Sequence, residues 1–137
     1  MSRITRHGDW KRRLAAYLAS VATREGQIGT HDCALFTAGA VAAMTGWSAD
    51  PSLTGYVTEA GGLRRLKAAG FADLPDLVGT YFTEQPASAA RAGDIALVDS
   101  PDGAALGIVQ GEFVYVAAKV GLGVVPMRRI LRSWKVV

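Results

Sequence analysis

The feature that most constrains this chain is a run of small and apolar residues from about Asp32 to Thr45. No charged side chain follows Asp32 within the run, and a helix that is apolar on all sides is buried on most of them. Gly39 stands between alanines and lets other elements approach closely, while Gly46 is suited to end the helix in a left-handed conformation. Asp32 is placed to cap the first turn. The sequence therefore predicts a buried central helix.

Helical patterns lie before about residue 85 and strand patterns lie after it. A first helix is predicted over 9–24, with Asp9 at its N-cap and an apolar face, and short helices are predicted over 62–70, with Leu63 and Leu66 facing inward, and around 73–82. This segregation favours an α+β fold in which a helical N-terminal half packs on an antiparallel sheet. The predicted strands are Asp94–Val98, Ala105–Val109, Glu112–Ala117, Gly121–Pro126 and Trp134–Val137. The residues predicted to be buried between the central helix and the sheet are Leu35, Phe36, Val41, Ile95, Leu97 and Ile108.

The length of 137 residues fits one domain, with a helical part over about 9–85 and a sheet part over about 93–137. No stretch approaches the ~20 apolar residues of a membrane span, and the basic N-terminus is not followed by the apolar run of a secretion signal. A single cysteine excludes an internal disulfide and a multi-cysteine zinc site. With only His7 and His31 beside it, we expect no metal and no cofactor.

Charge is unevenly distributed along the chain. Residues 1–24 carry six Lys/Arg and one acid, residues 119–137 carry five Lys/Arg and no acid, and residues 25–118 carry four Lys/Arg and eleven acids. One interpretation is ordinary solvated faces; the other is that both basic ends lie on one side and meet an acidic protein or nucleic acid. Nucleic acid is the less favoured partner, because no aromatic–basic pattern is present. The predicted contact residues are Arg12, Arg13, Arg128, Arg129 and Arg132, with Trp10 or Trp134 as apolar anchors.

Cys33 is the first candidate for chemistry. It falls in the first turn of the central helix, where free backbone N–H groups and the helix dipole favour a thiolate. The alternative is that a lone cysteine in an apolar helix only fills the core.

Motif order adds to this picture. The run Asp32-Cys33-Ala34-Leu35-Phe36 opens a small-residue helix, Gly93-Asp94 opens a strand, and Ala105-Leu106-Gly107-Ile108-Val109 forms the next strand, followed by Gly111. Over about residues 30–117 the chain resembles the NlpC-like, papain-like cysteine peptidases. Within that family it is most similar to small proteins encoded among phage tail genes and in gene transfer agents. The features shared with that group are a tryptophan-bearing first helix, the His-Asp-Cys run, a Gly-Tyr loop before a Gly-Leu helix, and a terminal tryptophan strand.

The resemblance breaks at the catalytic base. The position that matches the family's base histidine is Ala105, and the strand around Val116 offers no His, Asn or Gln to orient one. A cysteine hydrolase needs a base within hydrogen-bond reach of its sulfur. His31 is a weak substitute, since it lies two residues before Cys33 and would have to bend back. Asp32, Tyr56 and Ala105 are expected to line the cleft.

The resemblance, with its base missing, therefore implies a structural component of a phage or phage-like tail tip or baseplate that has an NlpC-like, catalytically inactive fold. Such a protein would be made in the bacterial cytoplasm, carried in the virion tail, and bound to neighbouring tail proteins of the hub or baseplate. The alternative is an active cell-wall peptidase or amidase that opens peptidoglycan for DNA delivery, with Cys33 as nucleophile and His31 or a partner's group as base. A third hypothesis is a free-standing bacterial domain that binds peptide or glycan without cleaving it.

Overall fold

The computed structural model describes residues 4–23, 32–48, 58–101 and 103–137. Helices occupy the first part of this chain and strands the second, which confirms the α+β class. The helices are α1 (Trp10–Val21), α2 (Cys33–Thr45), α3 (Glu59–Ala68) and α4 (Leu74–Tyr81). The strands are β1 (Thr83–Gln85), β2 (Ile95–Ser100), β3 (Gly103–Gln110), β4 (Phe113–Ala117), β5 (Leu122–Pro126) and β6 (Ile130–Lys135), with short 3-10 turns η2 (Ala87–Ala89) and η3 (Met127–Arg129).

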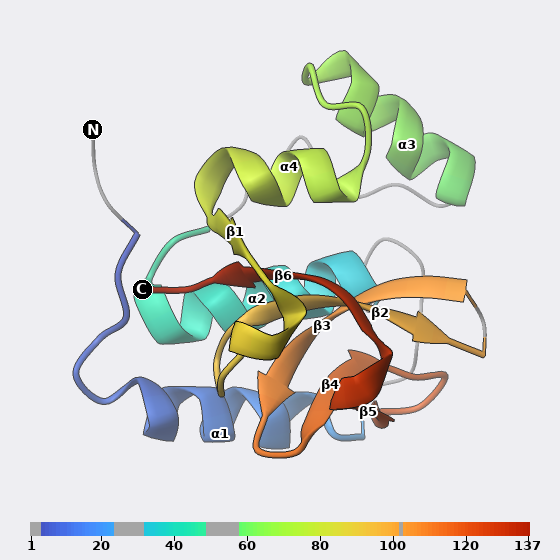
Figure 1. Cartoon of the computed structure of the whole chain (residues 1–137). Coiled ribbons are helices and arrows are strands. Elements are labelled where there is room, and N and C mark those ends of the chain that lie inside the picture. The colour runs from blue at the N-terminus through green and yellow to red at the C-terminus, as the bar shows by residue number, and fades with distance from the viewer. Residues whose placement is uncertain (1–3, 24–31, 49–57, 102) are drawn as a thin grey trace.

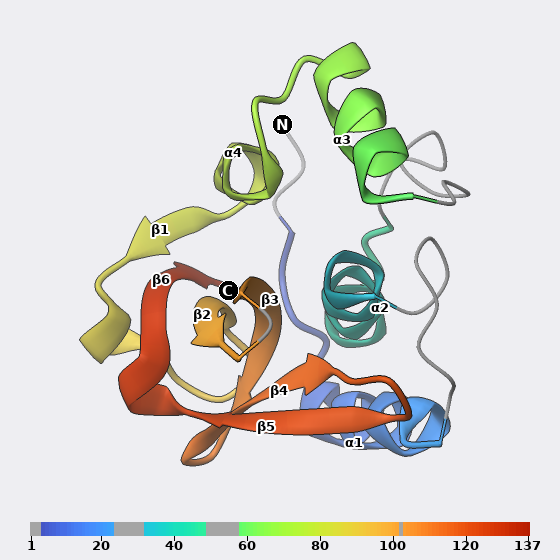
Figure 2. The same cartoon turned by 90° about the vertical axis from the view of Figure 1, so that its right-hand side faces the viewer.

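Within the described residues the strands form one antiparallel sheet in the order β1-β6-β2-β3-β4-β5. The part from β2 to β5 is the predicted meander. After β5 the chain returns across the molecule, so that β6 pairs with β2 and β1 pairs with β6 (Figure 1). Both views place α3 and α4 on the opposite side of the molecule from α1, with α2 between them (Figure 2).

The central helix is built as its sequence predicts. The Asp32 side chain accepts a hydrogen bond from the backbone N–H of Leu35 at 2.9 Å, which caps the first turn. Gly46 ends the helix with φ of 79°. A Cβ on Gly39 would overlap the Tyr17 ring, so this glycine allows α1 to lie directly against α2. The Tyr17 hydroxyl also donates to the Phe36 carbonyl oxygen at 2.9 Å.

Alternation along the strands gives the sheet a separate apolar cluster on each face. The first cluster joins α1 and α2 to the sheet and includes Phe36 and Ile108. The second cluster lies on the other face and includes Ala96 and Val109. Of the residues predicted to be buried where α2 meets the sheet, Phe36, Val41, Ile95 and Ile108 are buried in the first cluster, Leu97 is half-buried against it, and Leu35 is only half-buried.

Four sequence predictions need correction. The last strand begins at Ile130 rather than Trp134, and residues 83–85, which the sequence places in the helical part, form the strand β1. Asp9 occupies the N-cap position of α1, but its carboxylate makes no capping bond and binds Arg12 and Arg13 instead. Leu63 is 42% exposed, because α3 stands away from the sheet (Figure 1) and, among its described side chains, buries Leu66 alone.

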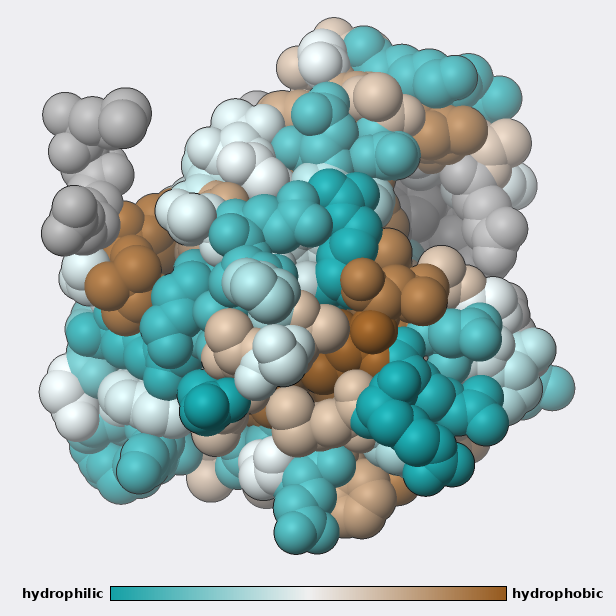
Figure 3. Space-filling model, viewed as in Figure 1, coloured by the Kyte–Doolittle hydropathy of each residue, from teal (hydrophilic) through white to brown (hydrophobic). Residues whose placement is uncertain are grey.

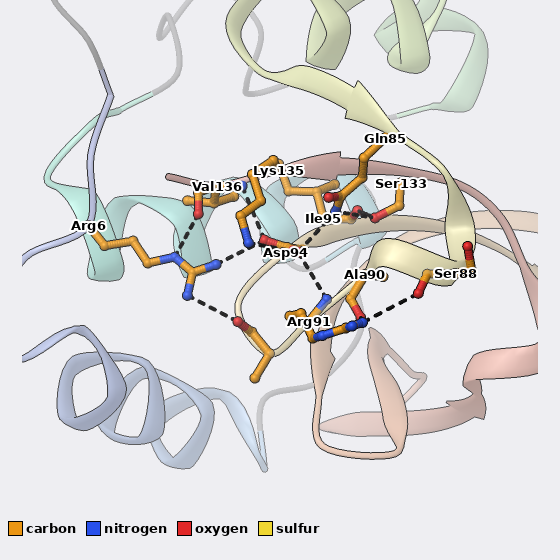
Figure 4. Close-up of polar contacts among 11 residues, drawn as sticks. Arg6, Gln85, Ser88, Ala90, Arg91, Asp94, Ile95, Ser133, Lys135 and Val136 are labelled. Atoms are coloured by element: carbon orange, nitrogen blue, oxygen red, sulfur yellow. Dashed lines mark hydrogen bonds and ion pairs between the residues drawn. The ribbon is translucent and has the colours of Figure 1, made fainter.

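A buried carboxylate, Asp94, holds the two ends of the chain to the sheet (Figure 4). Its oxygens accept hydrogen bonds from the Arg6 guanidinium at 2.9 Å, the Gln85 amide at 2.9 Å, and the backbone N–H groups of Arg91 at 2.9 Å and Val136 at 3.2 Å. These contacts give Asp94 a structural role at the turn into the sheet. Its contacts reach beyond that turn, to the N-terminal segment, β1 and the C-terminal segment.

Arg6 also joins the N-terminal segment to the C-terminal residues. Its guanidinium donates to the carbonyl oxygens of Val136 at 2.8 Å and Ala92 at 3.0 Å, and its backbone N–H donates to Val137. The guanidinium also lies 4.1 Å from the centre of the Trp10 ring. The first described segment is therefore fixed to the last residues of the chain.

The outer surface is largely hydrophilic in the view of Figure 3, with separate apolar patches, one of them beside the C-terminus, where Val137 is 58% exposed. None of the helices in the described ranges has the length and apolar character needed to cross a membrane.

Candidate functional site at Cys33

Cys33 is the first residue of α2 and lies half-buried against β3. The backbone amide of Leu106, in β3, is close enough to interact with the sulfur. Asp32 is committed to the helix cap through its bond to Leu35. The cysteine is thus placed between a helix N-terminus and a strand of the sheet, as predicted from its position in the sequence.

The surroundings of the sulfur nevertheless favour a neutral thiol. Burial raises the pKa of Cys33 above its ordinary value, and the nearby charge of Asp32 raises it further. Hydrogen bonding from the backbone amide of Leu106, and from those of Ala34 and Cys33 itself, lowers this pKa but does not offset the desolvation. The expected stabilisation of a thiolate by the helix N-terminus is therefore outweighed by loss of solvent.

The histidine that the structure does place is far from this thiol. His7 donates its backbone N–H to Met44 at 2.7 Å, and a Cβ on Gly46 would lie 3.3 Å from its ring nitrogen. Both contacts are at the C-terminal end of α2, whereas Cys33 is at the N-terminal end. A helix of 13 residues separates its ends by about 18 Å. His7 therefore cannot act as a base for Cys33.

Two of the predicted site residues, His31 and Tyr56, lie outside the described residues. Among the residues that are described, no group of His, Cys, Asp and Glu side chains is arranged to hold a metal ion.

The prediction that Ala105 lines a cleft with Cys33 is wrong in this structure. Ala105 packs against the second apolar cluster, whereas its neighbour Leu106 packs in the first cluster with α2. Alternation along β3 explains the difference, because adjacent side chains point to opposite faces of a sheet. Ala104 and Leu106, the neighbours of Ala105, also lack an ionisable group. A match to the family's base histidine displaced by one residue would therefore still find no base on β3.

The next strand shows the same alternation. Val116, the position matched to an orienting polar residue, is buried in the second cluster. Tyr115 and Ala117 are the β4 side chains that pack towards α2. Neither strand therefore presents an imidazole to the thiol, and the carboxamide of Gln110, at the end of β3, is four residues or about 13 Å along the strand from Leu106.

Three of the five predicted partner-binding arginines, Arg12, Arg13 and Arg132, are exposed but already paired within the chain. The Asp9 carboxylate binds Arg12 at 2.6 Å and Arg13 at 2.7 Å, and these arginines lower the pKa of Asp9 to about 2. Arg132 forms a two-pronged ion pair with Glu84, with bonds of 2.7 and 3.0 Å. Arg128 and Arg129 are exposed in η3.

The two tryptophans differ. Trp134 is 0% exposed and belongs to the first cluster, so it is a core residue and not a surface anchor as one of the predictions had it. Trp10 is half-buried beneath Arg6.

The basic residues predicted to contact a partner lie on separate elements, with Arg12 and Arg13 on α1 and Arg128 and Arg129 on η3. β5 begins beside the end of α1, where a Cβ on Gly121 would collide with the carbonyl oxygen of Ala22. The strand passes across α1 in the view of Figure 2 and leads to η3. Arg12 and Arg13 lie in the first turn of α1, about 14 Å along the helix from Ala22, so the contact at Ala22 does not bring them next to β5. The interpretation that both groups contact a partner together stays a prediction.

Comparison with known proteins gives a family but no function. No curated protein matches the chain. The family model described as a domain of unknown function, DUF6950, matches residues 5–136. Because this match spans nearly the whole sequence, the chain belongs to the DUF6950 family.

Proposed function

We propose that this chain is a non-catalytic structural component of a phage or phage-like tail tip or baseplate, built on an NlpC-like, papain-type fold. The observation that carries the proposal is the state of Cys33. It occupies the place of a nucleophile, at the start of a buried helix and against β3, yet burial raises its pKa and the strands facing it offer no base.

The resemblance to NlpC-like proteins supports the fold in this proposal. The order of a capped cysteine helix, a Gly-Asp turn and an antiparallel meander is the one that the resemblance implies. The place in a virion tail, assembly in the bacterial cytoplasm, and binding to neighbouring hub or baseplate proteins follow from the same resemblance. With catalysis lost, binding is the role left for the domain.

An active peptidoglycan peptidase or amidase is the second candidate, and one observation favours it. The backbone amides of Cys33, Ala34 and Leu106 act together on the sulfur to lower its pKa, as they would around a thiolate nucleophile. This enzyme would need its base from His31 or from a partner protein.

The first prediction concerns activity. Purified protein is expected to release no stem peptides from peptidoglycan, because a neutral thiol without a base neither attacks an amide nor protonates its leaving amine. Chromatography of digested cell walls measures the release, and the Cys33→Ala variant sets the background. Release that exceeds this background would establish the enzyme and reject the scaffold.

The second prediction concerns the thiol. Alkylation of Cys33 by iodoacetamide at pH 7 should be slower than that of the same cysteine in urea-unfolded protein, since the raised pKa leaves less thiolate and burial limits access. The rate in the folded protein should climb only at a higher pH than in the unfolded protein, because the raised pKa delays formation of the thiolate. Mass spectrometry follows the reaction. Rapid labelling of folded protein at pH 6 would indicate a stabilised thiolate and contradict the structure.

A further inference from the structure

The β5 strand has an open hydrogen-bonding edge. Among the described residues, β4 is the only strand that pairs with β5. The hairpin between them closes with a bond from the Ala118 N–H to the Gly121 carbonyl oxygen at 3.1 Å. Because bonded pairs alternate along an antiparallel ladder, the peptide groups of Leu122 and Val124 point away from β4. Pro126 has no N–H and ends this row of donors.

An apolar strip lies next to that edge. Val124 is 56% exposed and lies opposite Tyr115 in the ladder, while Phe113, two residues before Tyr115 and therefore on the same face, is 46% exposed. Nearer α1 this face is covered, since Leu122 and Tyr115 pack against the first cluster. The exposed part could therefore receive the side chains of an added strand.

The charges at the two ends of β5 select the partner. Lys119 precedes the strand, Arg128 and Arg129 follow it, and all three are exposed. Glu112 precedes Phe113, which pairs with Pro126, so its negative charge partly offsets the positive charge of η3. Residues 119–137 contain no acid. Both ends of the edge thus carry net positive charge, which attracts acidic groups.

The same charges disfavour a second copy of this chain. Antiparallel pairing of two β5 strands through Val124 would bring Lys119 of one copy opposite to, or within two residues of, Arg128 and Arg129 of the other. Like charges facing each other across a ladder are destabilising. Exposed apolar edges are templates for strand addition, so the open side of β5 calls for a partner of different charge.

We propose that β5 is the docking edge of this protein, and that its partner is an extended segment of another protein, apolar at alternate positions in its centre and acidic at both ends. The segment adds to the sheet beyond β5, takes its main-chain hydrogen bonds from Leu122 and Val124, and places its acids near Lys119 and η3. This inference rests on the proposed function in one respect: a domain without catalysis acts by binding.

The probe is a short capped peptide that alternates valine and threonine in its centre and carries two acidic residues at each end. A matched peptide carries lysines in place of the acids. Titration of isotope-labelled protein, followed by NMR, should show binding of the acidic peptide only, with slower hydrogen exchange at the amides of Leu122 and Val124. Equal binding of the two peptides, or no binding of the acidic one at millimolar concentration, would overturn the proposal.

Three variants locate the contact. Val124→Pro removes an outward N–H and should weaken the acidic peptide about tenfold or more, whereas Val124→Thr keeps the N–H and should stay within about threefold. Reversing the η3 charges with Arg128→Glu and Arg129→Glu should make the protein bind the lysine peptide more tightly than the acidic one. This double variant still tests the proposal if Val124→Pro does not fold. Wild-type affinity in Val124→Pro, with its unfolding midpoint unchanged, would exclude the edge.

Light scattering over a range of protein concentrations tests whether a second copy of this chain occupies the β5 edge instead. A wild-type dimer that Val124→Pro dissociates would assign the edge to a second copy and reject an acidic partner. These outcomes are separate from those for the proposed function, because Cys33-dependent hydrolysis would reject the scaffold without changing the peptide titration, and a failed titration would leave the absence of hydrolysis untouched.

Discussion

Replacing Asp94 by alanine is expected to lower the free energy of unfolding by about 3–5 kcal/mol. The carboxylate is 0% exposed and accepts bonds from Arg6, Gln85 and the backbone of Arg91 and Val136. Its removal leaves the largely buried guanidinium without a counter-charge and several donors without acceptors, and an unmade bond in the interior costs more than a made one contributes. Urea unfolding followed by circular dichroism measures the change.

Asp99→Ala is the matched control, because Asp99 lies in β2, the strand that directly follows Asp94, but is exposed. Its loss should change the unfolding free energy by less than about 0.5 kcal/mol. A double replacement, Asp94→Leu with Arg6→Met, should recover part of the stability lost in Asp94→Leu alone, since it removes both charges together. If Asp94→Ala and Asp99→Ala were equally stable, the buried network would not hold the chain ends as described.

Trp134→Ala should cost about 3–5 kcal/mol. Trp134 is 0% exposed and is the largest fully buried side chain in the described part of the protein, so alanine leaves a cavity between α4, β6 and the core of the sheet. The indole Nε1 is buried without a hydrogen-bond partner. Trp134→Phe removes that unpaired donor and keeps most of the volume, so its cost should be less than half that of alanine.

Chemical denaturation of the two Trp134 variants beside wild type gives both numbers. An alanine variant as stable as wild type would mean that the side chain is at the surface, where the sequence-based prediction of a partner anchor would put it. Equal losses for alanine and phenylalanine would mean that the indole N–H has a partner after all.

The elements that could be predicted are those whose signals are local. α2 needs only its apolar run, with the Asp32 cap and Gly46 at its ends, and the strands from β2 to β5 need only alternation and glycine turns. β1 could not be found in this way, since its three polar residues form a strand by pairing with β6, which follows 45 residues later in the chain. The Gln85 amide adds bonds to Asp94 and Ser133. The start of β6 could not be predicted either, because its pairing with β2 shifts register after Leu97 and this shift leaves no local sequence signal.

In the candidate site, too, the features with a local signal could be predicted and those that depend on packing could not. The place of Cys33 at a helix start, and the absence of a base on the facing strands, could be read from the residues. The direction of its pKa could not, since helix position and burial act oppositely and only the packing around the sulfur decides between them. The face on which Ala105 lies also depends on strand register, which a motif match does not determine.

The contact between Arg6 and the C-terminal residues has a consequence for the order of folding. The bond from the Arg6 guanidinium to Val136 joins residues 130 positions apart. Contacts of such separation form late, because the chain between them must first be ordered or its closure entropy must be overcome. On the ribosome, α1 and α2 are synthesised well before β6. The apolar sides of these helices therefore cannot be fully covered until the last strand has emerged. Docking of the N-terminal segment would then be among the final steps, and the growing chain would depend on the speed of synthesis and on chaperones until it occurs.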